Sequence, residues 1–366
     1  MSELKLVEQY TYKDILKAYL DCRKRKRTKD SSIEYELNYE ENLKSLLKRI
    51  NTETYNIGRT RCFAITRPKP REIWAAQFED RIVQHLVYNS VGEWFEDRFI
   101  EDTYSCIKER GTLAANKRLQ KVLRKSTQNW SKQSWALQLD IANFFVSISR
   151  PILWNLVENK IGNLSLTSKL LKQIIFEDPI ETAVIINKES LNNIPKRKSL
   201  FYCPKDHGLC VGNLTSQFLS NVYLNELDKY AKHVLKIKYY VRYVDDIVII
   251  DEDREKLYEL KEKLNSWLIT NRESYFQPNK TKIKPANSGI NFVGIVIHPY
   301  RNYIRNMTKN NFYETINKFK ALDHISKIEI NKIKGYSGIF KHTNSFNITK
   351  DINDTIKILE KSNELL

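Results

Sequence analysis

The sequence predicts an α+β fold, in which a small set of buried strands packs against helices. Long segments such as residues 12–22 place apolar side chains at helical spacing. Shorter runs such as residues 290–297 (INFVGIVI) have the length and β-branched composition of buried strands. With 41% apolar and 11% aromatic residues, the 366-residue chain can form a sizeable core, which excludes wholesale disorder.

The first third of the chain is mainly helical in pattern. Helical periodicity marks residues 12–22, 34–50, 80–99 and 113–125, and residues 59–66 (RTRCFAIT) form a strand-like run that leads to Pro68 and Pro70. The fourth of these helices is strongly basic. We therefore expect a strand over 59–66 among the helices of this part of the chain.

Strands and helices alternate through the remainder. A buried strand is expected over 134–141 (SWALQLDI), short mixed elements over 170–206, a helix from Ser216 to about Lys236, and helices over 304–366. Ser149-Arg150-Pro151 predicts a helix start, with Ser149 as the cap. Residues 239–250 (YYVRYVDDIVII) predict a hairpin with an acidic turn.

The chain carries 61 Lys and Arg against 44 Asp and Glu, a net charge of +17. This surplus favours an anionic partner, with a polyphosphate backbone as the first candidate, although a merely soluble basic surface is the other interpretation. Only 10 Gly and 9 Pro exclude collagen-like and low-complexity proteins.

Several compartments and cofactors are disfavoured. No apolar run reaches the roughly 18 residues of a membrane span, and the first ten residues lack the apolar segment of a secretory signal, so we expect a cytoplasmic protein with no membrane partner. Five scattered Cys without a CxxC do not predict a disulfide framework. Cys203, His207 and Cys210 suggest zinc, but a fourth ligand is missing.

Three carboxylates form the most informative pattern. Asp245 and Asp246 interrupt an apolar hairpin, and Asp140 ends another apolar strand. A solvated acidic turn is one interpretation. The other is that a cation relieves the repulsion, because oxygen ligands suit Mg²⁺ and paired ions serve nucleotidyl transfer.

The tetrapeptide YVDD at 243–246, with Asp140 upstream and followed by Phe144-Phe145, resembles the palm of a reverse transcriptase. Further blocks occur in the order of that family: KPREIWAAQFEDRIVQH (69–85), TYSCIKERGTLAA (103–115), RKSLFYCPKDHGLCVGNLTSQFL (197–219), PNKTKI (278–283) and NFVGIVIHP (291–299). The resemblance implies a polymerase right hand with fingers at 1–133, a palm at 134–303 with interleaved finger elements around 150–205, and a small helical thumb at 304–366. It implies an antiparallel palm sheet flanked by helices.

The stretch GLCVGNLTSQ is most similar to reverse transcriptases of diversity-generating retroelements, which are bacterial or phage-encoded and related to those of retrons and group II introns. Members of that subfamily copy a template RNA with errors opposite adenine, in mutagenic retrohoming. They work with a small basic accessory variability protein. The resemblance thus implies template RNA, RNA/cDNA duplex, dNTPs and such a protein as partners.

The same resemblance assigns roles to individual residues. Asp140, Asp245 and Asp246 match the metal-binding carboxylates, with the carbonyl of Ile141 completing the shell for two Mg²⁺, or Mn²⁺ as a substitute. Lys280 matches a lysine that protonates the leaving pyrophosphate.

Further positions match the nucleotide site. Phe145 matches the steric gate that excludes a 2′-hydroxyl, unless it is ordinary core packing. Lys69 and Arg71 match cations that hold the triphosphate, unless they lie in a solvated loop. Gln217, in the GNLTSQ block, is expected to contact the substrate. Phe292-Val293-Gly294 resembles the primer-grip turn.

Val211 departs from most of the family, which has Gln at this position. A Val offers no hydrogen bond around the incoming nucleotide, so we expect lower selectivity. Ile107 and Leu113 replace residues that are usually Arg and often His, which weakens polar contacts in the fingers. None of these departures affects the carboxylates, so we expect an active enzyme.

The positive charge is unevenly distributed. The net charge is +8 over 12–71, +7 over 108–132 and +6 over 304–350, but zero over 206–250, which contains Asp245 and Asp246. This distribution suits a template–primer held by phosphate contacts. The run RKRKRTK at 23–29 is a solvated helix end, a template-RNA contact or a localisation signal.

The sequence therefore predicts an RNA-directed DNA polymerase, a nucleotidyltransferase that works through two metal ions. One alternative retains the chemistry in a retron-like or phage-defence reverse transcriptase. Another is a catalytically inactive RNA-binding scaffold, which the three intact carboxylates disfavour.

Overall fold

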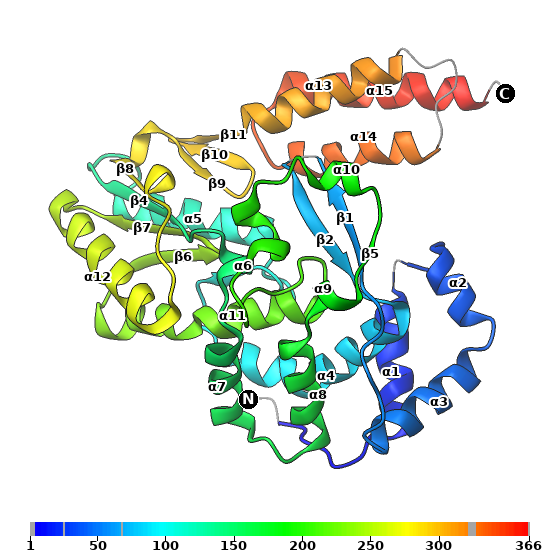
Figure 1. Ribbon diagram of the computed structural model, residues 1–366. Helices are drawn as coiled ribbons and strands as arrows, with labels where there is room; N and C mark the ends of the chain where they lie inside the picture. Colours follow the sequence, from blue (N-terminus) through cyan, green and yellow to red (C-terminus); the bar gives the residue numbers. More distant parts are fainter. Residues whose placement is uncertain (1–3, 25, 67–68, 321–326, 365–366) are drawn as a thin grey trace. The chain divides into compact units, whose positions relative to one another are not determined.

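The computed structural model describes residues 4–24, 26–66, 69–320 and 327–364 (Figure 1). Arg25 of the basic run and Pro68 lie outside the described residues. The chain forms two compact units, and each is assembled from three separate segments. Unit 1 comprises Met1–Ile107, Ile141–Lys236 and Glu262–Gln277, whereas unit 2 comprises Lys108–Asp140, Ile237–Lys261 and Pro278–Leu366.

Unit 1 is mainly helical. Its helices are α1 (Tyr12–Arg23), α2 (Asp30–Glu36), α3 (Tyr39–Asn51), α4 (Phe78–Glu96), α6 (Phe144–Ser147), α7 (Arg150–Ile161), α8 (Leu166–Phe176), α9 (Pro179–Thr182), α10 (Lys188–Leu191) and α11 (Leu214–Lys229), with a π-helical turn Tyr230–Val234 and the 3₁₀ turns Lys196–Lys198 and Leu200–Tyr202. Helix α1 packs on α3 and α4, and α11 packs on α4 and α7. A capping box between Thr11 and Asp14 begins α1.

The strands of unit 1 are β1 (Arg61–Ile65), β2 (Arg71–Ala75), β3 (Thr103–Tyr104) and β5 (Val184–Ile185). Three of them form a small sheet in the order β2-β1-β5, in which β1 is antiparallel to β2 and parallel to β5. The buried side chains of Cys62 and Trp74 form a core on this sheet with Leu200 and Cys210.

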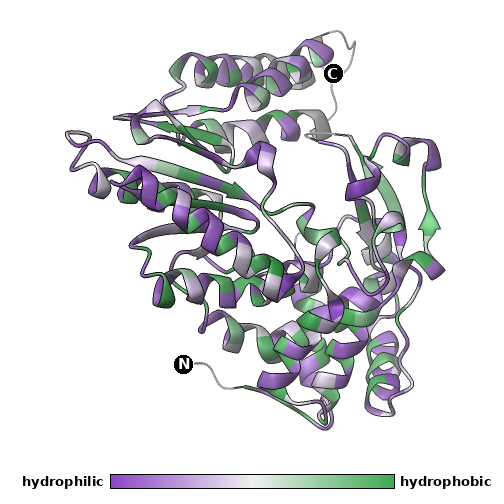
Figure 2. Cartoon of the chain, turned by 60° about the vertical axis from the view of Figure 1, so that its left-hand side comes forward, coloured by the Kyte–Doolittle hydropathy of each residue, from purple (hydrophilic) through white to green (hydrophobic). Residues whose placement is uncertain are grey.

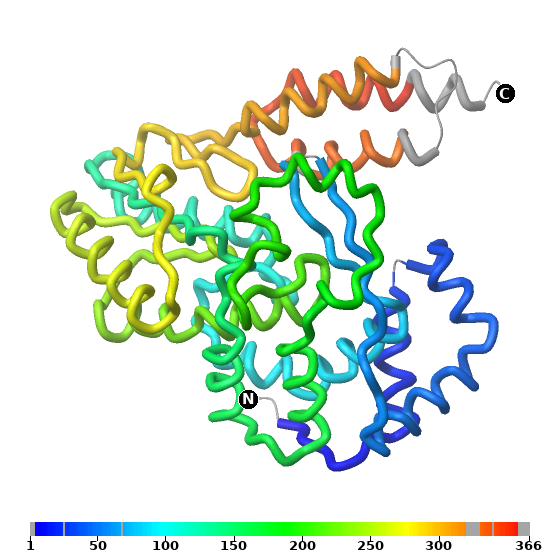
Figure 3. The backbone as a smooth tube through the Cα atoms, in the orientation of Figure 1, coloured from blue at the N-terminus to red at the C-terminus, as the bar shows by residue number. Residues whose placement is uncertain are grey.

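Unit 2 contains an antiparallel sheet in the order β6-β7-β4-β8. Its strands are β4 (Trp135–Asp140), β6 (Tyr239–Tyr243), β7 (Asp246–Asp251) and β8 (Lys282–Pro285), with the 3₁₀ turns Pro278–Lys280 and Ala286–Ser288 on either side of β8. The buried face of α5 (Thr112–Ser126) packs against β6 and β7. Figure 3 shows β4, far from β7 in sequence, running beside it.

A second antiparallel sheet of unit 2 has the order β11-β10-β9, from β9 (Ile290–Phe292), β10 (Ile295–His298) and β11 (Arg301–Ile304). It is followed by α13 (Asn306–Lys320), α14 (Lys327–Phe340) and α15 (Phe346–Glu364). The rings of Phe312, Tyr336 and Phe340 contact one another between α13 and α14, so these aromatic residues form a core of the helical tail. Helix α12 (Arg254–Arg272) contributes residues to both units.

Helices carry hydrophilic and hydrophobic residues on different faces, as Figure 2 shows by colour. None of the helices in the described ranges is both long and apolar enough to cross a membrane. Several local expectations needed revision. The single strand expected over 290–297 is a hairpin, in which Val293 and Gly294 connect β9 to β10. The helix expected over 34–50 is split into α2 and α3, the helix expected to reach Lys236 ends in a π-helical turn, and 304–366 begins with the last residue of β11. Ser149 is the N-cap residue of α7 but makes no side-chain capping bond.

Candidate active site

The three carboxylates meet at one end of the first sheet of unit 2. Asp140 is the last residue of β4 and Asp246 is the first residue of β7, and the antiparallel register places them opposite each other. Asp245 lies in the two-residue turn between β6 and β7, closed by the pair Tyr243 and Asp246. The predicted acidic hairpin and its proximity to Asp140 are therefore both present.

The electrostatics of this cluster are unfavourable to full ionisation. Burial, together with the neighbouring charges of Asp246 and Asp140, raises the pKa of Asp245 to about 7. Lys280 opposes this effect, and its Nζ lies 2.5 Å from Oδ1 of Asp140. Lys280 ends the 3₁₀ turn before β8, the strand that pairs with β4, so the sheet also positions this cation.

The donor chemistry of the cluster fits a divalent cation with oxygen ligands. Adjacent carboxylates that repel one another in a partly buried position are the groups that Mg²⁺ stabilises. Within the described ranges, however, no three His, Cys, Asp or Glu side chains are gathered closely enough to hold one ion. Because Lys280 contacts Asp140, a cation that uses this oxygen must displace the ammonium group. Ile141 directly follows Asp140 and forms an isolated bridge with Phe276.

Within unit 1, backbone hydrogen bonds connect Phe145 to the segment that carries Val211. The amide of Leu209 donates to the carbonyl of Phe145 at 2.8 Å, and the amide of Trp74 in β2 donates to the carbonyl of Val211 at 2.9 Å. Gly212 has a φ of +122°, and a Cβ there would lie 3.2 Å from Ile73. Only Gly therefore allows this close approach to β2.

The other predicted substrate residues have different surroundings. Phe144 is buried, whereas Phe145 is only half-buried, so its ring remains partly accessible. Lys69 and Arg71 are exposed, before and at the start of β2. Gln217 is exposed on α11, and its Oε1 accepts a hydrogen bond from Cys106 Sγ at 3.3 Å. The sheet brings together only the predicted carboxylates and Lys280.

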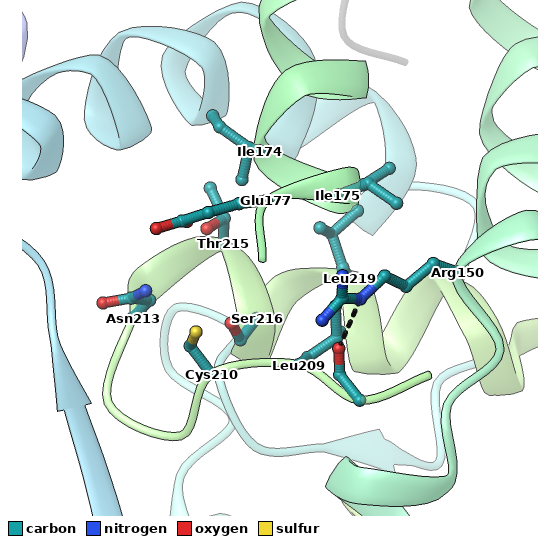
Figure 4. A pocket seen from close by; sticks show the side chains of 11 residues that line it. Arg150, Ile174, Ile175, Glu177, Leu209, Cys210, Asn213, Thr215, Ser216 and Leu219 are labelled. Atoms are coloured by element: carbon teal, nitrogen blue, oxygen red, sulfur yellow. Dashed lines mark hydrogen bonds between the residues drawn. The ribbon is translucent and has the colours of Figure 1, made fainter. Parts of the chain in front are cut away.

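A small pocket next to the Val211 segment contains polar residues that the sequence interpretation missed (Figure 4). Arg150 Nε donates to the carbonyl of Gly208 at 2.9 Å. Burial raises the pKa of Glu177 to about 7, although Thr60 donates a hydrogen bond to Glu177 Oε1 at 3.1 Å. Arg150 belonged to a predicted helix start, and no sequence signal indicated that it would be buried.

The suggested zinc ligands do not converge. Cys203 Sγ donates to the backbone carbonyl of His207, and the His207 ring contacts the Lys205 carbonyl and Glu273. Burial raises the pKa of the Cys210 thiol well above its ordinary value, which disfavours the thiolate needed for metal binding. Cys203 and His207 therefore use these atoms in hydrogen bonds that stabilise their own segment of the chain.

The outer face of α5 is a candidate nucleic-acid contact within unit 2. Lys117, Lys121, Arg124 and Lys125 are exposed, and in the described part of the chain none of them pairs with a carboxylate. The helix contains no acidic residue. Like charges at i and i+4, such as Lys117 and Lys121, disfavour the helix slightly, and phosphate groups would relieve this repulsion.

Comparison with known proteins identifies the family of the chain. Residues 66–297 match the family model described as reverse transcriptase (RNA-dependent DNA polymerase), which covers more than half of the chain. The chain belongs to the reverse transcriptase family. The α+β polymerase fold expected from the sequence is confirmed, and so is the assignment to a family of RNA-directed DNA polymerases. No curated protein matches this reverse transcriptase.

Solved structures give a distant similarity in fold. Apo telomerase from Candida tropicalis, truncated from its C-terminal domain, is 12% identical with a TM-score of 0.47, over 68% of this chain and 55% of the telomerase chain. Telomerase from Candida albicans, in complex with a fragment of telomeric RNA, is 11% identical with a TM-score of 0.49, over 90% and 57%. The reverse transcriptase thus spans little more than half the length of either telomerase chain.

Proposed function

We propose that this reverse transcriptase copies a template RNA into cDNA with a catalytic centre formed by Asp140, Asp245 and Asp246. The observation that carries the proposal is the cross-strand pairing of Asp140 with Asp246, beside the turn that presents Asp245. A family match without adjoining carboxylates would not support catalysis, whereas a register in which these three carboxylates adjoin one another supports it.

Each residue has a defined part in the proposed reaction. Two Mg²⁺ ions, when bound, supply Lewis-acid stabilisation of the attacking and leaving oxygens. Asp140, Asp245 and Asp246 would hold them, together with the carbonyl of Ile141. Lys280 Nζ contacts Asp140, and we propose that Lys280 donates a proton to the leaving pyrophosphate.

The nucleotide-binding residues belong to the same proposal. Lys69 and Arg71 bind the triphosphate through charge-assisted hydrogen bonds, and Gln217 contacts the substrate. The half-buried ring of Phe145 excludes a 2′-hydroxyl, so the product is DNA. The exposed basic face of α5 contacts phosphates of the template RNA or of the RNA/cDNA duplex.

We further propose that the enzyme is the error-prone polymerase of a diversity-generating retroelement, with a small basic accessory protein as its partner. Support comes from the GLCVGNLTSQ stretch and from Val211, which is half-buried and offers no side-chain hydrogen bond to a nucleotide. An apolar side chain discriminates poorly between pairing geometries, whereas a hydrogen-bonding group rejects incorrect ones.

Primer extension tests the proposed function. The full chain is incubated with an RNA template, a DNA primer, dNTPs and Mg²⁺, and Asp245→Ala and Asp246→Ala serve as inactive controls. We expect the wild-type protein to extend the primer and the two variants not to extend it. Chelation of Mg²⁺ should abolish extension by the wild-type protein. RNA binding without Mg²⁺-dependent extension would support the scaffold interpretation and refute the polymerase.

Sequencing of the cDNA tests the error-prone role. Val211→Gln should lower misincorporation opposite template adenine, because the amide restores a polar contact near the nucleotide. Val211→Leu, which is also apolar, is the matched control and should retain the errors. An unchanged error frequency in Val211→Gln would exclude Val211 as a cause of low fidelity.

A further inference from the structure

The turn that carries Asp245 has an unfavourable backbone conformation. Val244, its first central residue, has a φ of +55°, in the left-handed region that a β-branched residue rarely adopts. The pair Tyr243 and Asp246 closes the turn, so only Val244 and Asp245 lie between the strands. In hairpins of this kind Gly is preferred at the first central position. Some contact must therefore maintain Val244 in this conformation.

Arg242 supplies such a contact. Its side chain is fully buried in β6, and its Nη1 donates to the carbonyl of Val244 at 2.9 Å. Val244 lies two residues beyond Arg242, in the turn that follows β6, so this hydrogen bond joins a buried strand residue to the turn. A buried guanidinium is costly unless it is hydrogen-bonded, and the Val244 carbonyl accepts one of its hydrogen bonds.

We propose that Arg242 is a positioning residue that maintains the Val244–Asp245 turn in the conformation that presents Asp245 and Asp246 to a divalent cation. This inference rests on the proposed function, because it assigns cation binding to those two carboxylates. Arg242 itself contacts neither substrate nor cation in this role. It acts through the Val244 carbonyl, which connects a buried strand residue to the two carboxylates that follow.

A double-mutant cycle isolates this role from general stabilisation. Arg242→Lys keeps the positive charge but loses the planar group that reaches the carbonyl. Val244→Gly removes the need for the Arg242 hydrogen bond, because Gly adopts positive φ without steric cost. The readout is Mn²⁺ affinity of the full chain, measured by titration calorimetry without nucleic acid or nucleotide.

We expect Arg242→Lys to weaken Mn²⁺ binding about tenfold with Val244 present, and less than about threefold in the Val244→Gly background. Equal losses in both backgrounds, or unchanged affinity in a folded Arg242→Lys protein, would overturn the proposal. Arg272→Lys is the matched control, since Arg272 is another buried arginine that donates to a backbone carbonyl, that of Tyr223 at 2.7 Å. Its effect should not depend on Val244→Gly.

Three further outcomes are informative. If Arg242→Lys does not fold, the proposal requires that adding Val244→Gly restores a folded, Mn²⁺-binding protein; failure of the double variant would make Arg242 a core residue only. If the wild-type protein binds Mn²⁺ with the expected coupling but does not extend primers, the polymerase assignment fails and the positioning role stands. Absence of Mn²⁺ binding in the wild-type protein would reject both.

Discussion

Two of the two-residue hairpins of unit 2 differ in what they present. Val244 and Asp245 connect β6 to β7, and Val293 and Gly294 connect β9 to β10. In both, the first central residue is a Val at positive φ, +55° and +40° respectively. In both, a buried polar side chain donates to the carbonyl of that Val, from Arg242 at 2.9 Å and from Asn116 at 3.4 Å.

The second central residue distinguishes them. Gly294 has a φ of +90° with open space around its Cα, so the second hairpin accepts its conformation at little cost. The first hairpin has no Gly and carries Asp245, whose ionisation is opposed by burial and by two neighbouring carboxylates. Strain of about 1–3 kcal/mol at one residue persists only where the surroundings enforce it, often at functional sites. Both hairpins have such a residue, Val244 and Val293, but only the first presents carboxylates.

Removing the carboxylate opposite the first hairpin should have the largest effect. Asp140→Asn preserves shape but removes a proposed metal ligand, so primer extension should fall by at least roughly a hundredfold. Single-turnover extension with saturating dNTP measures the change. Asp251→Asn, at the far end of β7 and paired with Lys256, is the control and should retain activity. Equal activity of the two variants would contradict the assignment.

Helix α5 contacts the second hairpin, because Asn116 donates to the carbonyl of Val293. The exposed basic residues of α5 can be changed without altering the first hairpin. Neutralising Lys117, Lys121, Arg124 and Lys125 to Gln should reduce the slope of log affinity for RNA against log salt by about 3, because each lost phosphate contact contributes roughly 0.7–0.9. Fluorescence anisotropy with labelled RNA measures this slope.

A control with the same change in net charge replaces Arg49, Lys132, Lys169 and Lys256 with Gln. Each of these cations already pairs with a carboxylate, so the slope should change much less. Equal slopes for both fourfold variants would show that net charge, and not the face of α5, determines RNA affinity.

The two hairpins should also differ in pH dependence. In EDTA, between pH 3.8 and about 7, folded Asp245 retains a proton that the unfolded chain has released, so the free energy of unfolding falls as pH rises. Asp245→Asn lacks this fall. Relative to wild type it should be more stable above pH 7, by on the order of 2–4 kcal/mol, and equal near pH 3. Urea denaturation at each pH measures the difference, and parallel profiles would contradict it.

The smallest effect is expected in the second hairpin. Gly294→Ala should lower the free energy of unfolding by about 1 kcal/mol, because Ala at φ +90° is strained although no atom obstructs its Cβ. Gly335→Ala is the control, since Gly335 is exposed in helix α14 with equally open space. It should stabilise the protein by about 0.5–1 kcal/mol. Chemical denaturation that gives both changes the same sign would refute this account of the turn.

Much of the site followed from local sequence. The strand that ends at Asp140, the hairpin around Asp245 and the basic helix were all predictable, because periodicity and composition act over a few residues. The tail helices were also expected. Boundaries were less predictable, as the split of the helix at 34–50 shows, since tertiary contacts determine where a helix ends.

Tertiary structure alone decided how these pieces combine. The sequence by itself determined the elements, the surplus of positive charge, the three carboxylates and the family they indicate, because each depends on neighbouring residues or on motifs in order. The register that sets Asp140 opposite Asp246 joins distant strands, and nothing local encodes it. Likewise, Arg242 is a single charge in an apolar strand until folding buries it beneath Val244. Long-range pairing and burial exist only in the folded chain, so only the tertiary structure revealed them.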